Sequence, residues 1–402
     1  MLHRSFLLSV AVWVVFAGAL RVAVVPPESC GKTGAASLDA AAREATAWIL
    51  RNQQPDGAYT YLYYPDQDVV PNDYNIVRHA GVTMSLYQSA THYKDRETLR
   101  AADSGLDWLI RRLAKRHGWS APTQNNRDAS LGAAALMTVS LAERRLATGD
   151  SKHDDLMREL GRFMVALQRN DGNFALGFDL GSDAPFQGTS RYYPGEALWA
   201  LALLHEAFPG EGWDEAARRD LDYLITSRDD EAGITFQPLP DQWLAYGLAE
   251  MAPWGLDDVH IEHARALAGR FGLLVRTEAQ REHGSLGRLV RGPEARASGL
   301  GTWTEALSSL WRLASTDDRF SSLEDKVKDR LVCSAGILAA RQVDASAAAK
   351  SPRPGLMQGA WFGRGETRMD DQQHALTGLL YTLDALDGDT DRSPLAPVLP
   401  SP

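Results

Sequence analysis

The sequence contains few cysteines and no excess of basic residues. Two cysteines among 402 residues are too few for a disulfide framework, so packing must hold the core together. Lys and Arg number 42 against 52 Asp and Glu, a net charge of −10, which argues against a general nucleic-acid binder because phosphate neutralisation needs a basic face. With 44% hydrophobic and 23% charged residues, the chain can still bury a sizeable core, which excludes disordered, collagen-like and coiled-coil classes.

Several chemical motifs are also absent. The sequence has no Gly-rich phosphate loop, no serine elbow and no His-Glu-x-x-His pattern. Since no expected helix carries His and acidic residues at ligand spacing, we predict no catalytic metal and no cofactor. Cys333 lies in an expected amphipathic helix and is interpreted as a packed small hydrophobe, and Cys30 has no obvious partner.

A long apolar run occurs at the N-terminus. Residues 1–4 are short and basic, and residues 5–25 are apolar except for Arg21, a pattern typical of an export signal. Ala17-Gly18-Ala19 fits a cleavage site, but the run continues to Val25, and about 20 apolar residues can span a bilayer. A cleaved signal and an uncleaved membrane anchor both stay open, and we expect the body to lie outside the cytoplasm. Residues 26–36 are interpreted as a linker, and residues 389–402 as a disordered Pro-rich tail.

Helical periodicity dominates residues 37–388. One set of expected helices is amphipathic, and the alternate set is apolar nearly all round, as in residues 131–142, so that other helices must enclose it. The expected helices are 37–54, 74–93, 96–116, 128–148, 153–170, 192–208, 213–228, 241–252, 259–280, 302–315, 320–342 and 371–386. Six repeats of an enclosed and an amphipathic helix predict an all-α (α/α)6 toroid, a closed ring of six helical hairpins.

Two expected outer helices end in the same motif. Residues 53–59 and 168–174 both read Gln-x-x-Asp-Gly-x-aromatic. Asp-Gly supplies a turn in which Gly takes positive φ, and the aromatic side chain packs beneath it. The motif resembles the (α/α)6-toroid superfamily, which holds six-hairpin glycosidases, N-acylglucosamine 2-epimerase-like enzymes, uronyl epimerases, polysaccharide lyases and squalene-cyclase or prenyltransferase repeats. The resemblance implies the architecture rather than one activity.

In such a ring the N-termini of the inner helices meet at one mouth, each with a partial positive charge. The residues expected there are polar and aromatic, which suits a sugar with its hydroxyls and apolar C–H faces. The candidate substrate-binding residues are Asp73, Tyr74, Asn75, Arg78, Arg127, Asp128, Arg191, Tyr192, Asp241, Gln242, Trp243, Trp303, Arg368 and Gln373. The candidate catalytic residues are Glu196, Glu305, Asp370 and Asp371 as acids, with His79, His374 and Tyr193 as helpers.

Many of these residues also have a purely structural interpretation. Aspartates that begin helices are favoured simply as N-caps. Buried histidines are often satisfied within the core, and an acid inside an apolar run can pair with backbone or arginine. The capping alternative applies to Asp73, Asp128, Asp241 and Asp370. The core alternative applies to His79 and His374, and the pairing alternative applies to Glu196 and Glu305.

Residues 280–301 form the longest irregular segment and contain Arg281, His283, Arg288, Arg291 and Arg296. Segments of this length are usually functional or disordered. Folded over the mouth, it would supply a basic rim that suits a uronic acid, sulfated or phosphorylated substrate. A solvated loop is the alternative.

The leading hypothesis is an exported or membrane-anchored protein that acts on an envelope or extracellular glycan by hydrolysis or epimerisation. A non-catalytic glycan-binding or polysaccharide-export scaffold is the alternative from another class. A terpenoid-cyclase-like enzyme, suggested by Asp370-Asp371, is a minor alternative because the mouth is polar. The expected partners are a glycan or sugar and, if the signal is uncleaved, a membrane through residues 5–25; the sugar, the linkage and the oligomeric state stay open.

Overall fold

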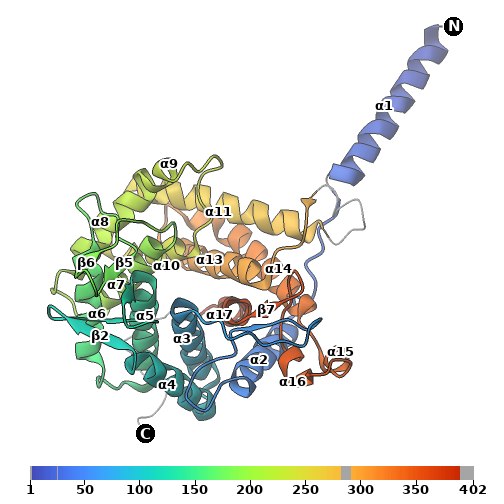
Figure 1. Cartoon of the computed structure of the whole chain (residues 1–402). Helices are drawn as coiled ribbons and strands as arrows, with labels where there is room; N and C mark the ends of the chain where they lie inside the picture. Colours follow the sequence, from blue (N-terminus) through green and yellow to red (C-terminus); the bar gives the residue numbers. More distant parts are fainter. Residues whose placement is uncertain (1, 25, 282–290, 390–402) are drawn as a thin grey trace.

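The computed structural model describes residues 2–24, 26–281 and 291–389. Its body is a ring of helices (Figure 1). In chain order the long helices are α2 (Ala35–Arg51), α3 (Ile76–Tyr93), α4 (Arg96–Ile110), α5 (Leu131–Thr148), α6 (Asp154–Leu167), α7 (Tyr193–Ala207), α8 (Trp213–Thr226), α10 (Gln242–Met251), α11 (Asp258–Ala279), α13 (Ala297–Thr316), α14 (Glu324–Arg341) and α17 (Met369–Asp387). Short helical turns are α9 (Arg228–Glu231), η1 (Ala252–Trp254), η2 (Ser321–Leu323), α15 (Ala345–Ala348) and α16 (Pro354–Met357).

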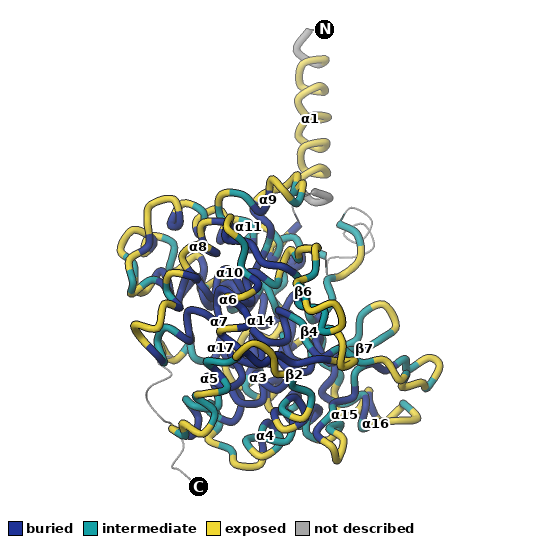
Figure 2. Tube along the Cα trace, turned by 60° about the vertical axis from the view of Figure 1, so that its left-hand side comes forward, coloured by how far each residue is buried: buried dark blue, intermediate teal, exposed yellow. Residues whose placement is uncertain are grey.

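Six of the long helices form a closed inner ring. Helix α3 packs on α5, α5 on α7, α7 on α10, α10 on α13, α13 on α17, and α17 returns to α3. The outer helices α4, α6, α8, α11, α14 and α2 pack, in that order, on the same six inner helices. The inner helices are the apolar set and are buried along most of their length (Figure 2). The predicted (α/α)6 toroid is therefore confirmed.

Helix α17 closes the ring through very short backbone separations. A Cβ added to Gly301 of α13 would lie 2.4 Å from the carbonyl carbon of His374 in α17. Only glycine permits this approach. The contact holds the N-terminal parts of α13 and α17 against each other.

The repeated turn motif folds as its residues predict. Gly57 and Gly172 have φ values of 92° and 93°, and Tyr59 and Phe174 are almost fully buried. In each copy the glutamine bridges to the aromatic residue, as Gln53 does to Tyr59. The same local chemistry therefore ends two different outer helices.

Strands occur only as short pieces in the connecting loops. Among the described residues they are β1 (Leu62–Tyr63), β2 (Leu113–Arg116), β3 (Trp119–Pro122), β4 (Asp128–Ser130), β5 (Gly177–Asp179), β6 (Ala184–Pro185) and β7 (Thr367–Arg368). All pairings are antiparallel: β1 with β7, β2 with β3, and β5 with both β4 and β6. The pairing of Leu62 with Arg368 ties the first connection of the ring to the start of α17.

Two inner helices begin three or more residues away from their predicted starts. Helix α5 begins at Leu131 because Ser130 caps it, accepting a hydrogen bond from the Ala133 amide, which leaves Asp128 in β4. Helix α13 begins at Ala297, five residues before the expected start. Glu305 therefore lies deeper in the ring than the first turn.

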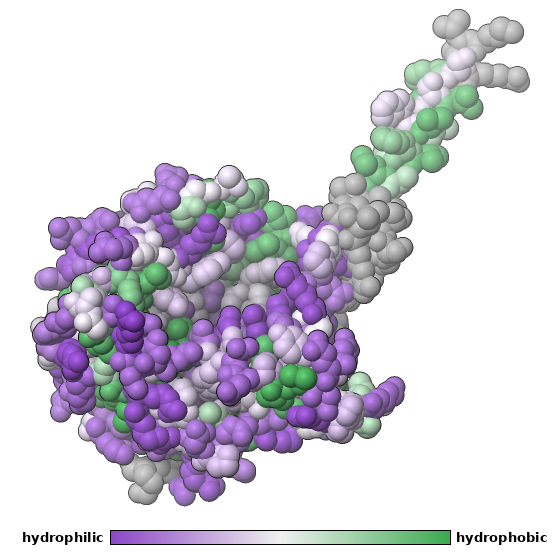
Figure 3. Space-filling model, in the orientation of Figure 1, coloured by the Kyte–Doolittle hydropathy of each residue, from purple (hydrophilic) through white to green (hydrophobic). Residues whose placement is uncertain are grey.

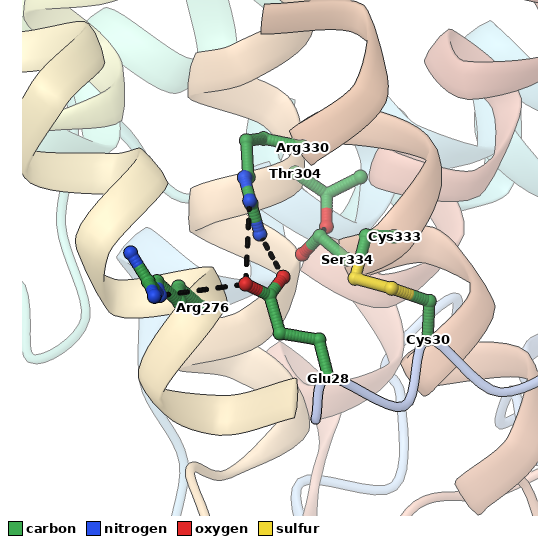
Figure 4. The surroundings of a disulfide bond; sticks show 7 residues. All are labelled: Glu28, Cys30, Arg276, Thr304, Arg330, Cys333 and Ser334. Atoms are coloured by element: carbon green, nitrogen blue, oxygen red, sulfur yellow. Dashed lines mark hydrogen bonds and ion pairs between the residues drawn. A yellow bond between two sulfur atoms is a disulfide. The ribbon is translucent and has the colours of Figure 1, made fainter. Parts of the chain in front are cut away.

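The two cysteines form a disulfide, so the interpretation of Cys333 as an unpaired packed residue is wrong. Cys30 and Cys333 have Cα atoms 4.5 Å apart and are separated by 303 residues in sequence (Figure 4). Nearby, Glu28 forms ion pairs with Arg276 of α11 and Arg330 of α14. These contacts fix Glu28 and Cys30 to the body. Helix α2 begins at Ala35, within the predicted linker of residues 26–36.

Helix α1 (Leu2–Val24) projects from the ring, and its described side chains, residues 5–21, are exposed. The space-filling view shows hydrophobic residues along α1 (Figure 3). The face of the body that is turned toward the viewer is largely hydrophilic. Within the described ranges, no helix combines the length and apolarity needed to cross a membrane. The predicted tail, residues 389–402, falls almost wholly outside the described residues.

Candidate functional site

A cavity of about 450 Å³ lies where the inner helices begin. The first turns of α3, α7, α10, α13 and α17 contribute to its walls. Eleven of the predicted site residues line it: Asn75, Arg78, Tyr192, Tyr193, Glu196, Gln242, Trp243, Trp303, Asp370, Gln373 and His374. The sequence pattern at the helix starts therefore located a real concave surface.

Glu196 lies at this cavity in the first turn of α7 and is 5% exposed. Its Oε2 atom has no hydrogen-bond partner. A Cβ added to Gly132 of α5 would come within 2.5 Å of that oxygen, so the backbone of α5 packs directly against the carboxyl group. Burial, helped by the charge of Asp241, raises the pKa of Glu196 to about 8, which keeps the group protonated at neutral pH.

Asp241 lies behind Glu196 rather than in the cavity. It is fully buried and caps α10 by accepting from the Trp243 amide at 3.0 Å. Its other oxygen, Oδ2, accepts from Arg228, whose Nε also donates to Asp229 at 3.1 Å. A Cβ on Gly195 would lie 2.9 Å from Asp241 Oδ2. Asp241 therefore has the capping role that the sequence offered as an alternative.

The sequence reasoning missed Arg228. Arg228 is 2% exposed. In the sequence, however, it is the last residue of the expected amphipathic helix 213–228, whose charged residues are expected to face solvent. No local signal distinguishes it from surface arginines, because its partner Asp241 is 13 residues away.

His374 and Glu305 form a buried pair across α17 and α13. His374 Nδ1 lies 3.0 Å from Glu305 Oε1 and 3.2 Å from its Oε2. Burial acts to lower the pKa of His374, but the Glu305 carboxylate, with a smaller effect of Asp370 and Asp371, raises it overall. Because Nδ1 is bonded to Glu305, Nε2 is the ring nitrogen left for the cavity.

Asp370 lines the cavity and is held by two arginines. Its Oδ2 lies 3.3 Å from Arg78 Nε and 3.1 Å from Arg368 Nη2. Its Oδ1 is buried and has no hydrogen-bond partner. Arg78 also donates to the Tyr61 hydroxyl. One oxygen of Asp370 is therefore fixed by arginines, and the other is buried at the cavity wall without a hydrogen-bond partner.

Asp371, predicted as a catalytic acid, has a structural position instead. It is 1% exposed and does not line the cavity. It accepts hydrogen bonds from the Arg368 and Ser298 amides at 3.1 Å and pairs with Arg296. It joins the first turns of α13 and α17, and all its acceptor capacity goes to that junction.

His79 is likewise a core residue rather than a cavity residue. Tyr74 lies 2.6 Å from His79 Nδ1, and Nε2 donates to the Gly105 carbonyl at 2.8 Å. The ring stacks on Trp108 with centroids 4.2 Å apart. Burial lowers its pKa to about 3, so the structure gives His79 the core interpretation, and its half-buried partner Tyr74 does not line the cavity.

The remaining candidates lie around the mouth without lining the cavity. Asp73 and Arg191 are exposed, Arg127 pairs with Asp179, and Asp128 accepts from Asn125 at 2.7 Å. Arg368 contacts the cavity residue Asp370 from behind.

The expected basic rim does not form in the described part of residues 280–301. Arg281 pairs with Glu278 and donates to the Arg291 carbonyl, and Arg296 pairs with Asp371 and Glu366. His283 and Arg288 lie outside the described residues. Within the described ranges, no group of three or more His, Cys, Asp or Glu side chains could hold a metal ion.

Chemically, the cavity combines groups that can donate and accept protons with aromatic walls. Trp243 lies beside His374, with ring centroids 5.8 Å apart, and stacks on Trp199. Aromatic faces next to carboxyl and imidazole groups can bind a sugar ring and move protons on it.

Comparison with known proteins supports the architecture. No protein-family model and no curated protein matches the sequence. Among solved structures, an unsaturated glucuronyl hydrolase specific for heparin is 15% identical with a TM-score of 0.59, covering 88% of this chain and 99% of its own. An α-1,6-mannanase from Salegentibacter sp. is 11% identical with a TM-score of 0.61, covering 87% and 99%. A cellobiose 2-epimerase from Spirochaeta thermophila is 16% identical with a TM-score of 0.57, covering 87% and 98%.

At these identities the likeness establishes the fold and leaves the activity to the site itself. By its fold, the chain is an (α/α)6 toroid, an architecture similar to that of these solved structures.

Proposed function

We propose that the chain is a carbohydrate-active enzyme that performs acid–base chemistry on a sugar bound in the mouth cavity. One observation carries this proposal: Glu196, a buried acid with a raised pKa, and His374, held by a buried glutamate, line the same cavity. Titratable groups with perturbed pKa values that meet in a cleft are typical of active sites.

In this proposal Glu196 is the general acid. Its pKa of about 8 keeps the proton on the carboxyl group at pH 7, close to the value at which proton transfer is most effective. The Glu196 side chain lines the cavity, and its Oε2 has no hydrogen-bond partner in the protein, so that oxygen is not committed to another protein group.

His374 is the general base, and Glu305 is its positioning residue. The bond from Nδ1 to Glu305 fixes the tautomer and the ring orientation and strengthens the base. Asp370, with its unpartnered Oδ1, is the second carboxyl group that a glycoside hydrolase requires.

Two reactions use this set of groups. Hydrolysis would use Glu196 to protonate the glycosidic oxygen and Asp370 or His374 to activate water. Epimerisation would use His374 to remove a proton next to a carbonyl and Glu196 to assist its return. The two unpartnered carboxyl oxygens favour hydrolysis, and the His374–Glu305 pair favours epimerisation.

A screen of oligosaccharides in D₂O separates the two reactions. Hydrolysis creates new reducing ends without deuterium on carbon, whereas epimerisation by proton removal incorporates deuterium at the epimerised carbon. His374→Gln should reduce either activity by about 100-fold or more. If a glycan binds and none is turned over, the proposal of an enzyme is contradicted. The alternative of a glycan-binding protein is then supported, because the aromatic lining alone would suffice for binding.

The enzyme would act outside the cytoplasm. The Cys30–Cys333 disulfide favours this location because structural disulfides persist in oxidising compartments, and the apolar residues 5–25 are typical of an export signal. Alkylation of free thiols in cells, followed by mass spectrometry, should find both cysteines protected. Alkylation of both would contradict this location.

A further inference from the structure

The basic side chains that line the cavity already have acidic partners. Among the described lining residues the one arginine is Arg78, which pairs with Asp370 and donates to the Tyr61 hydroxyl. His374 pairs with Glu305. The recognition of an anionic sugar needs an uncommitted cation, usually an arginine that offers two parallel N–H donors.

The charges immediately behind the lining are also balanced. Three guanidinium groups there face three carboxylates in one connected set of ion pairs. The members are Arg78, Arg296 and Arg368 on one side, and Asp370, Asp371 and Glu366 on the other. A carboxylate or sulfate brought to this wall would find each of these guanidinium groups already paired, and it would approach Asp370 as a like charge.

The unsatisfied atoms of the lining call for hydroxyl groups instead. Asp370 Oδ1 and Glu196 Oε2 are buried without hydrogen-bond partners, on residues only 7% and 5% exposed. A buried carboxyl oxygen without a partner is costly, and a sugar hydroxyl relieves that cost by donating to Asp370 Oδ1 or by accepting from the protonated Glu196 carboxyl group. A neutral sugar offers such donors in quantity, and its C–H face suits the exposed or half-buried rings of Tyr192 and Trp303.

We infer that the mouth cavity takes a neutral, hydroxyl-rich sugar, that Asp370 accepts hydrogen bonds from its hydroxyls, and that sugars bearing carboxylate or sulfate groups are disfavoured. This inference rests on the proposed function only for the identity of the site, since it concerns binding rather than turnover. A neutral sugar takes the place of the acidic substrate that the arginines of residues 280–301 suggested.

The test compares matched glycans with the full-length wild-type chain. Neutral oligosaccharides and their C6-oxidised counterparts, which differ only in a carboxylate for a primary hydroxyl, are titrated by calorimetry. The neutral member should bind about tenfold tighter or more. Equal or tighter binding of the oxidised member would overturn the inference, as would binding of neither.

Two variants test the role of Asp370 itself. Asp370→Asn should weaken neutral-glycan binding about tenfold, because the hydrogen bond loses its charged acceptor. Asp155→Asn, the same change at a side chain 99% exposed on α6, is the matched control and should bind as the wild type does. Unchanged binding by a folded Asp370→Asn protein would remove Asp370 from the inference.

Failure of the inference and failure of the proposed function are distinguishable. If neutral glycans bind but none is turned over, the enzyme proposal fails and the sugar class stands. If an oxidised glycan binds more tightly and is turned over, the enzyme proposal stands and the sugar class fails.

Discussion

Replacing Glu196 with glutamine should abolish most activity and at the same time stabilise the protein. Glutamine keeps the shape of the side chain but cannot donate the proton, so kcat should fall about 100-fold or more. The gain in stability follows from the cost of burying a group that must stay protonated. A buried ion pair at Glu196 would give the opposite result, destabilisation by about 3–5 kcal/mol, but its Oε2 has no partner.

The size of this gain depends on pH. The pKa of Glu196 rises from 4.5 to about 8 on folding. Below about pH 4.5 the carboxyl group is protonated in both states and costs nothing. As pH rises, the unfolded chain loses the proton while the folded chain keeps it, so the folded protein loses stability until about pH 8. At 1.36 kcal/mol per pH unit the cost is of the order of 3 kcal/mol at pH 7 and about 5 kcal/mol above pH 8.

The assay is urea denaturation of the wild type and Glu196→Gln at pH 5, 7 and 9, together with turnover. The variant should gain most at pH 9 and least at pH 5. Glu206→Gln is the matched control, because Glu206 lies at the other end of α7 and burial next to Glu250 raises its pKa to about 8 as well. It should also gain stability at high pH, but it should keep its activity. A Glu196→Gln protein with normal turnover and lower stability at pH 9 would refute the reasoning.

Three other changes test further parts of the structure. Glu305→Gln should lower the pKa of His374, so the acid limb of the kcat/KM profile should move to lower pH; an unmoved limb would contradict the pairing. Arg228→Met should destabilise the protein by about 3–5 kcal/mol, measured by urea denaturation, because it leaves Asp241 buried without its cation; a loss below about 1 kcal/mol would show that the pair is unimportant. Cys30→Ser should cost about 2–4 kcal/mol by removing the disulfide, and an unchanged melting temperature under oxidising conditions would argue against that bond.

The ring could be predicted from the sequence because its signals are local and repeated. Helix periodicity marks each enclosed and amphipathic helix, and the turn at Asp56-Gly57 depends only on neighbouring residues. The start of α13 was misplaced because residues 297–301 include two glycines, which read as loop, while tertiary packing against α17 makes them helical.

The site could be predicted only in part, for a related reason. Polar residues at the starts of inner helices lie near the mouth, and this placed Glu196, Asp370 and His374 at the cavity. Whether such a residue is free or already paired depends on partners far away in sequence. Asp371 pairs with Arg296 across 75 residues, and Cys30 pairs with a cysteine 303 residues away, and neither pairing has a local signal.

A crystal structure of the Glu196→Gln protein soaked with a neutral oligosaccharide tests the central claim most directly. The account predicts a sugar ring in the mouth cavity, with one oxygen within hydrogen-bonding distance of residue 196 and a hydroxyl bonded to Asp370 Oδ1. A glycan bound elsewhere on the toroid, with the cavity of about 450 Å³ holding only solvent, would contradict it.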